Sequence, residues 1–79
     1  MRTMTCLQLG GACEVTFSAE TFEEIAELSM AHGAEMLAAG NEAHLAAMQA
    51  MQTLIQDPAA MHAWFESKRR EFEALQSEE

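Results

Sequence analysis

Two cysteines and two histidines are the side chains of this sequence whose types could do chemistry together. Cys6 and Cys13 flank a Gly10–Gly11 pair, and His32 and His44 follow farther along the chain. Thiolates and imidazoles are ligands that zinc and copper(I) prefer, whereas calcium and magnesium need oxygen ligands. The residue types therefore predict a site for a soft or borderline transition metal.

The spacing of these residues is less specific than their type. Six residues separate Cys6 from Cys13, whereas paired zinc-binding cysteines are usually about two to four residues apart. Buried free cysteines also occur as small apolar core residues. His32 stands within an apolar stripe, where a core histidine would also fit. Packing roles for these residues therefore stay open beside metal binding.

The placement of the cysteines depends on a β-hairpin that we predict in residues 1–18. Apolar and polar residues alternate on both sides of Gly10–Gly11, which can supply the positive φ angles of a two-residue turn. In that register Cys6 faces Val15, and the two cysteines are diagonal neighbours with Cβ atoms roughly 7 Å apart. This separation is too long for an easy disulfide but allows a shared metal ion. An odd-length loop would place the two side chains on opposite faces.

Three helices are predicted after the hairpin. Thr21 and Glu24 have the spacing of a capping box, Asn41 can cap a second helix, and Asp57–Pro58 is typical of a cap followed by proline. The helices are expected over residues 21–39, 42–56 and 58–75. The chain, residues 1–79, is thus predicted to be a single α+β domain, with the hairpin packed on the first helix and the later helices forming an antiparallel pair.

Apolar residues at helical spacing predict the buried faces of these helices. The predicted residues are Phe22, Ile25, Leu28, His32 and Met36 in the first helix, His44 or Leu45, Met48, Met51, Leu54 and Ile55 in the second, and Met61, Trp64, Phe65, Phe72 and Leu75 in the third. The first stripe turns His32 toward the hairpin. A metal-binding imidazole needs a hydrogen-bond partner on its other nitrogen, and Glu24 or Glu35 could accept that bond.

Composition limits the classes of partner and function. The 13 acidic and 4 basic residues give a formal charge of -9, which disfavours nucleic acid and anionic membrane surfaces. No apolar run has the length of a signal peptide core or a membrane span, so we expect a cytoplasmic protein with reduced cysteines. No catalytic triad, carboxylate pair or phosphate-binding loop can be assembled, so we expect no enzyme.

The small size of the chain favours help from a metal ion or a partner. A chain of 79 residues is near the limit at which a single core outweighs chain entropy. Methionine and aromatic residues dominate the apolar faces of the helices expected over residues 42–56 and 58–75. These faces predict a homodimer, with an unknown protein partner as the other occupant.

The hairpin and first helix together resemble a known family. The order Thr5-Cys6, Leu9-Gly10, Cys13, Glu20-Thr21-x-Glu23-Glu24 and His32 is similar to a bacterial and archaeal domain-of-unknown-function family of predicted small metal-binding proteins. The resemblance covers about residues 3–37 and implies metal binding. Family members often carry a second histidine shortly after the one matching His32. Here that stretch reads Glu35-Met36-Leu37-Ala38, and His44 is the possible substitute.

The sequence thus leads to three functional hypotheses. The first is a non-catalytic protein that holds a transition metal, with zinc favoured over copper(I), through Cys6, Cys13 and His32, and with His44 or an outside group as the fourth ligand. The second is a helical interaction or scaffold module whose cysteines only pack in the core. The third is a thiol switch that forms a Cys6–Cys13 disulfide.

Overall fold

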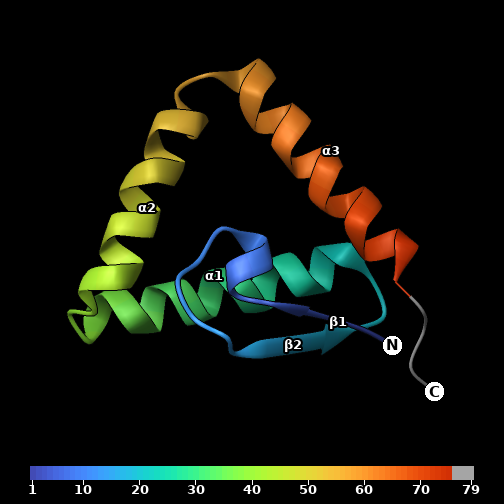
Figure 1. Ribbon diagram of the computed structural model, residues 1–79, viewed down its shortest axis with the longest axis horizontal. Helices are drawn as coiled ribbons and strands as arrows, with labels where there is room; N and C mark the ends of the chain where they lie inside the picture. Colours follow the sequence, from blue (N-terminus) through green and yellow to red (C-terminus); the bar gives the residue numbers. More distant parts are fainter. Residues whose placement is uncertain (76–79) are drawn as a thin grey trace.

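The computed structural model describes residues 1–75 and consists of an antiparallel hairpin followed by three helices (Figure 1). The elements are β1 (Arg2–Thr5), the short 3-10 helix η1 (Leu7–Leu9), β2 (Thr16–Ala19), α1 (Phe22–Ala38), α2 (Glu42–Ile55) and α3 (Pro58–Ala74). The predicted α+β class and the predicted order of elements are confirmed. Residues 76–79, which the sequence assigns to the same domain, lie outside the described part of the chain.

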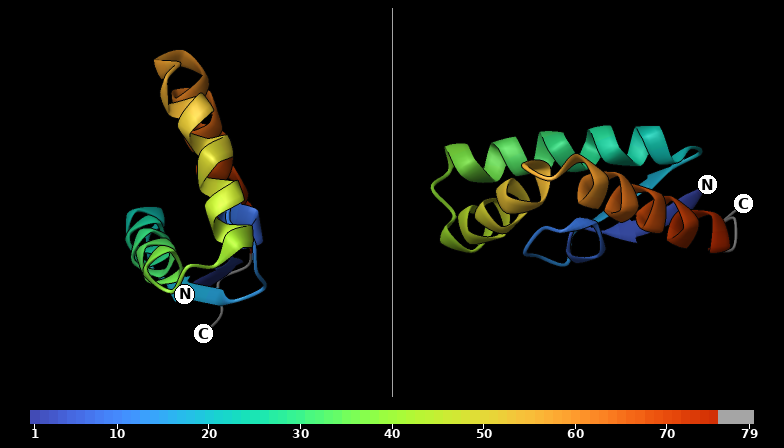
Figure 2. Two further views of the ribbon diagram at one scale, coloured as in Figure 1. Left: turned by 90° about the vertical axis from the view of Figure 1, so that its left-hand side faces the viewer. Right: turned by 90° about the horizontal axis from the view of Figure 1, so that it is seen from above.

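The helices are arranged as an open triangle rather than a closed bundle. α2 rises to a corner and α3 descends from it, so the two helices spread apart instead of lying side by side (Figure 1). The corner falls between Ile55 and Pro58. Seen from the side, α2 and α3 form one layer that leans away from α1 (Figure 2). The molecule measures 36 × 30 × 15 Å. Its small thickness leaves little room for a central core.

Each α-helix begins beside the capping residue predicted from the sequence. The side-chain oxygens of Thr21, Asn41 and Asp57 each accept a hydrogen bond from a backbone amide in the first turn that follows. Such bonds satisfy amides that the first turn of a helix leaves without partners. The helix bounds consequently differ from the predicted ones by at most one residue.

The hairpin has the predicted register, but the predicted two-residue turn is wrong. The Cys6 amide donates to the Val15 carbonyl at 2.8 Å, as expected if these two residues face each other. The strand ladder ends there because the chain enters η1, and Gly10 takes a φ of 87° at the end of that helix. The connection therefore spans residues 6–15. The cysteines come together through this folded connection and not across a regular hairpin face.

A small core joins the hairpin to the start of α1 and the end of α3. Its buried members are Met4, Leu9, Ala19, Phe22, Ile25 and Phe72. The ring of Phe22 meets those of Phe65 and Phe72 edge-on, with centroids 5.0 and 5.9 Å apart. Edge-to-face contacts of this kind add to the energy of apolar burial. The core therefore ties the N-terminal hairpin to the C-terminal helix.

Three apolar residues predicted to be buried are instead largely exposed. Leu28, Leu45 and Ile55 are 43%, 48% and 51% exposed. Leu28 is neither in the buried core nor among the partly buried residues packed against it, whereas Ile25 of the same helix is in that core. The sequence allowed either His44 or Leu45 to face inward at the start of α2, and His44 is the one that is buried. Ile55 borders the open space between the helices because α2 and α3 diverge.

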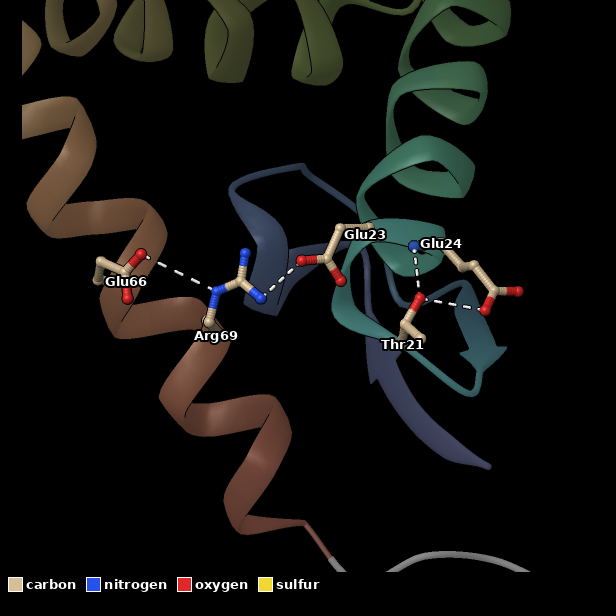
Figure 3. A network of polar contacts seen from close by, with 5 residues as sticks. All are labelled: Thr21, Glu23, Glu24, Glu66 and Arg69. Carbon is tan, nitrogen blue, oxygen red and sulfur yellow. Dashed lines mark hydrogen bonds and ion pairs between the residues drawn. The ribbon is translucent and has the colours of Figure 1, made fainter.

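An exposed ion pair connects the first turn of α1 to α3 (Figure 3). Arg69 Nη1 lies 2.6 Å from Glu23 Oε1, and Arg69 Nε lies 3.9 Å from Glu66 Oε1. The hydrogen bond from Arg69 lowers the pKa of Glu23, and the same bond raises the pKa of Arg69. The guanidinium also lies 5.5 Å from the ring centroids of Phe22 and Phe65. These contacts hold α3 beside α1, although solvent screening limits their energy.

Candidate metal centre

Three segments of the chain contribute four side chains to a single cluster. Cys6 precedes η1, Cys13 lies in the same connection, His32 is in the middle of α1 and His44 is in the first turn of α2. Their ligand atoms all lie within 4.8 Å of one another. The structure thus brings together all the residues that the sequence singled out and positions them to bind a metal ion.

Two sulfur–nitrogen separations in the cluster are close to the edge of a tetrahedron around one ion. Cys6 Sγ lies 3.6 Å from His44 Nε2, and Cys13 Sγ lies 3.3 Å from His32 Nε2. Zinc–sulfur bonds of about 2.3 Å and zinc–nitrogen bonds of about 2.0–2.1 Å give a sulfur–nitrogen edge of about 3.5 Å. The other separations among the four ligand atoms are no longer than 4.8 Å.

The cluster is covered on one side and reaches the surface on the other. Cys6 and His44 are 2% and 5% exposed, whereas Cys13 and His32 are half-buried. The His32 ring meets the rings of Phe17 and His44 edge-on, with centroids 5.6 and 5.2 Å away. An ion in this place would therefore be shielded from water on the side of Cys6 and His44.

Asn41 fixes the ring of His44. Its Oδ1 accepts a hydrogen bond from the His44 backbone amide at 3.0 Å and lies 2.8 Å from His44 Nδ1. The amide oxygen of Asn41 carries no hydrogen, so it can only accept hydrogen bonds. His44 Nδ1 therefore carries a proton and donates it to this oxygen. The unprotonated nitrogen is then Nε2, which points at the cluster. Hydrogen bonds of this kind orient metal-binding histidines and set their tautomer.

Replacing Asn41 should therefore weaken metal binding separately from its effect on the helix cap. Asn41→Ser keeps a good capping residue but is too short to reach the ring, so we expect metal affinity to fall about 10–100-fold with little loss of stability. Asn41→Ala should lose the same affinity and about 1 kcal/mol of stability. Asn41→Asp should keep both. Competition with a chromophoric chelator and thermal unfolding measure the two effects, and equal affinities for Ser and Asp would contradict the assignment.

Gly11 lets the connection fold closely over Cys6. The Gly11 amide donates to the Cys6 carbonyl at 2.8 Å, and the Leu7 amide donates to the Cys13 carbonyl at 3.0 Å. A Cβ atom placed on Gly11 would overlap Cys6 Sγ. The two glycines thus serve different purposes, because Gly10 supplies a positive φ and Gly11 supplies the space that the sulfur occupies.

The sequence identified the four cluster residues but not the hydrogen bond that orients one of them. Neither Glu24 nor Glu35 hydrogen-bonds to His32 within residues 1–75, and the Glu24 carboxylate is engaged by Thr21. Asn41 provides such an acceptor for the other histidine, His44. The spacing of Asn41 and His44 could have predicted this hydrogen bond. A capping residue three positions before a histidine lies next to the histidine ring in the first turn of the helix.

The fold and the cluster define a class: a small α+β domain with two cysteines and two histidines positioned to bind a metal ion. Comparison with protein families, curated proteins and solved structures finds no match to this chain. The resemblance of residues 3–37 to predicted metal-binding proteins therefore stays a prediction. Across residues 1–75, no helix combines the length and hydropathy that crossing a bilayer requires.

Proposed function

We propose that this protein is a non-catalytic metal-binding domain that holds one zinc ion through Cys6, Cys13, His32 and His44. The observation that carries this proposal is the convergence of four ligand atoms within 4.8 Å. They come from the connection between β1 and β2, from α1 and from α2, which are separate in the sequence. Core packing alone gives no reason for four side chains of metal-binding types to meet at their ligand atoms.

The chemistry of the donors supports zinc. A tetrahedral arrangement of two sulfur and two nitrogen ligands is typical of structural zinc sites. Calcium and magnesium need oxygen ligands, and the cluster offers none. Copper(I) accepts thiolates as well, but two imidazoles completing a tetrahedron favour zinc.

A full set of protein ligands supports a non-catalytic role. Catalytic zinc sites usually have about three protein ligands and keep a further position open for water or substrate. Here four side chains surround the place of the ion, and Cys6 and His44 are buried. An ion bound to them would crosslink the hairpin connection to α1 and α2. This is the kind of support that a small domain needs.

The state of the cysteines supports a reducing compartment. Cys6 and Cys13 are both free thiols, and zinc binds thiolates rather than disulfides. We place the protein in the cytoplasm for this reason. Its formal charge of -9 supports a protein that binds neither nucleic acid nor an anionic membrane surface.

Elemental analysis of protein purified without a metal-affinity tag tests the proposal. We expect about one equivalent of zinc in the wild type and less than about a tenth in the His32→Ala variant, because a structural site needs all its ligands. His62→Ala is the matched control, since His62 is an exposed histidine outside the cluster. It should keep its zinc.

Two results would contradict the proposal. A wild-type protein without any transition metal, whose two thiols titrate freely, would favour a scaffold with core cysteines. In that case replacing both Cys6 and Cys13 by alanine should cost only packing energy, roughly 1–3 kcal/mol. An equivalent of copper in place of zinc would overturn the choice of metal.

A further inference from the structure

An apolar groove of about 470 Å³ lies between the three helices. Residues of α1, α2 and α3 line it, among them Met30, Met48, Met51, Ile55, Met61 and Trp64. Cys6 and His44 also line it, so the groove adjoins the candidate metal centre. No charged side chain of residues 1–75 lines it. α2 and α3, which both line the groove, spread apart in Figure 1.

α2 is the wall of the groove that the chain covers only in part. His44 is its buried residue. Met48, Met51 and Leu54 are half-buried, and Leu45 and Ile55 are exposed. Glu42 is the one charged residue of α2, at its first position. A helix with so few charged residues is normally buried against a neighbour. α2 is therefore less covered within one chain than its composition leads one to expect.

The distribution of charge indicates what covers it. The chain carries a formal charge of -9, so a basic partner would be attracted to its acidic surfaces and not to a groove without charge. A second copy of the chain presents the same uncharged face. A twofold contact through this face brings no opposing carboxylates together at its centre, and the same patch serves both copies.

The shape of the single chain also favours a second copy. Within residues 1–75 seven apolar residues are buried, and the molecule is 15 Å thick. Its radius of gyration is 12.6 Å, above the roughly 11.6 Å expected for a compact chain of this length. Small domains with an incomplete core often complete it by oligomerising. We infer that the protein is a homodimer in which α2 of each copy covers the groove of the other.

A matched pair of variants in α1 tests this interface. Met30 is 71% exposed and lines the groove, whereas Leu28 is 43% exposed and lies outside it. Met30→Glu should weaken dimerisation by about 30-fold or more, as expected for a charge placed in the centre of an interface. Leu28→Glu adds the same charge two residues away and should leave dimerisation unchanged. Ile55→Glu tests the α2 wall and should act as Met30→Glu does.

Sedimentation equilibrium on the full chain supplied with zinc measures the mass. We expect the wild type and Leu28→Glu to have twice the chain mass of 8.7 kDa and the two groove variants to have the chain mass itself. Circular dichroism and zinc content should match the wild type, and if one groove variant misfolds, the other decides.

Three results would overturn the inference. The first is a wild type that stays monomeric at about 100 μM, well above the Kd of a stable dimer. The second is a Leu28→Glu variant that weakens dimerisation as much as the groove variants do. The third is a monomer on which native mass spectrometry finds a small apolar molecule. Because mass and zinc content are measured separately, the dimer can fail while the metal site stands, and the reverse also holds.

Discussion

Removing the metal should lower the midpoint of thermal unfolding by about 15–30 °C. A ligand present at about 1,000 times its Kd stabilises the folded state by about 4 kcal/mol, and each kcal/mol moves the midpoint of a domain this small by about 4–8 °C. The proposed ion would join the hairpin connection to α1 and α2. Few other buried contacts replace that link, because α2 contributes only His44 to the buried residues.

The single tryptophan reports this loss directly. Gly10 lies so close to Trp64 that a Cβ on the glycine would be 3.2 Å from the indole Cζ2. Trp64 therefore packs against the connection that carries both cysteines. A chelator should shift its emission to longer wavelength and reduce the helical circular dichroism, and added zinc should restore both signals.

A variant without thiolates is the control for chelation. The protein with Cys6→Ala and Cys13→Ala should begin at the lower midpoint and should not respond to chelator or zinc. A wild type whose midpoint moves by less than about 2 °C, which corresponds to under about 0.5 kcal/mol, would show that no metal supports this fold.

The helices could be predicted closely because their start signals are local. Thr21, Asn41 and Asp57 each bond to amides within the next three residues. Such contacts depend on neighbours in the sequence and hardly on the rest of the fold. The structure therefore has the helices where the sequence predicts them, whatever the helices later pack against.

The connection between the strands was harder to predict because two uses of the Gly10–Gly11 pair compete. Alternation of apolar residues fixed the register, and Cys6 does face Val15. A two-residue turn would satisfy that register, but it would leave Cys6 and Cys13 on an open strand face. In the structure Gly10 instead ends η1, and Gly11 makes room for a sulfur. The contact between Gly11 and Cys6 exists only in the folded connection, and the spacing of the residues does not reveal it.

The buried faces of the helices could be predicted only where one side is clearly apolar. In α2, alanine, methionine, glutamine and leucine occur on nearly every side, so the sequence allowed either His44 or Leu45 to face inward. The hydrogen bonds of Asn41 to the His44 ring and amide favour His44. Because both bonds use one oxygen, Asn41 caps the helix and orients the candidate ligand His44 at the same time.

Gly11→Ala should abolish tight metal binding while leaving the helices in place. The new Cβ would overlap Cys6 Sγ and come within 3.0 Å of the Cys6 carbonyl oxygen, so the sulfur must leave its position in the cluster. We expect affinity to fall by more than the roughly 10–100-fold that loss of an outer hydrogen bond costs. The φ of Gly11 is not positive, so the effect comes from the lost space and not from backbone strain.

Gly33→Ala provides the matched control for this substitution. Gly33 is in α1 beside His32, and its added Cβ would meet only Met48 Cε, at an ordinary 3.8 Å. Alanine should therefore keep metal affinity and add about 0.5–1 kcal/mol of helix stability. Competition with a chromophoric chelator measures affinity, and thiol titration in zinc shows whether Cys6 is released. If Gly11→Ala binds zinc as tightly as the wild type, the connection can move aside, and the position of Cys6 Sγ in this structure does not define the site.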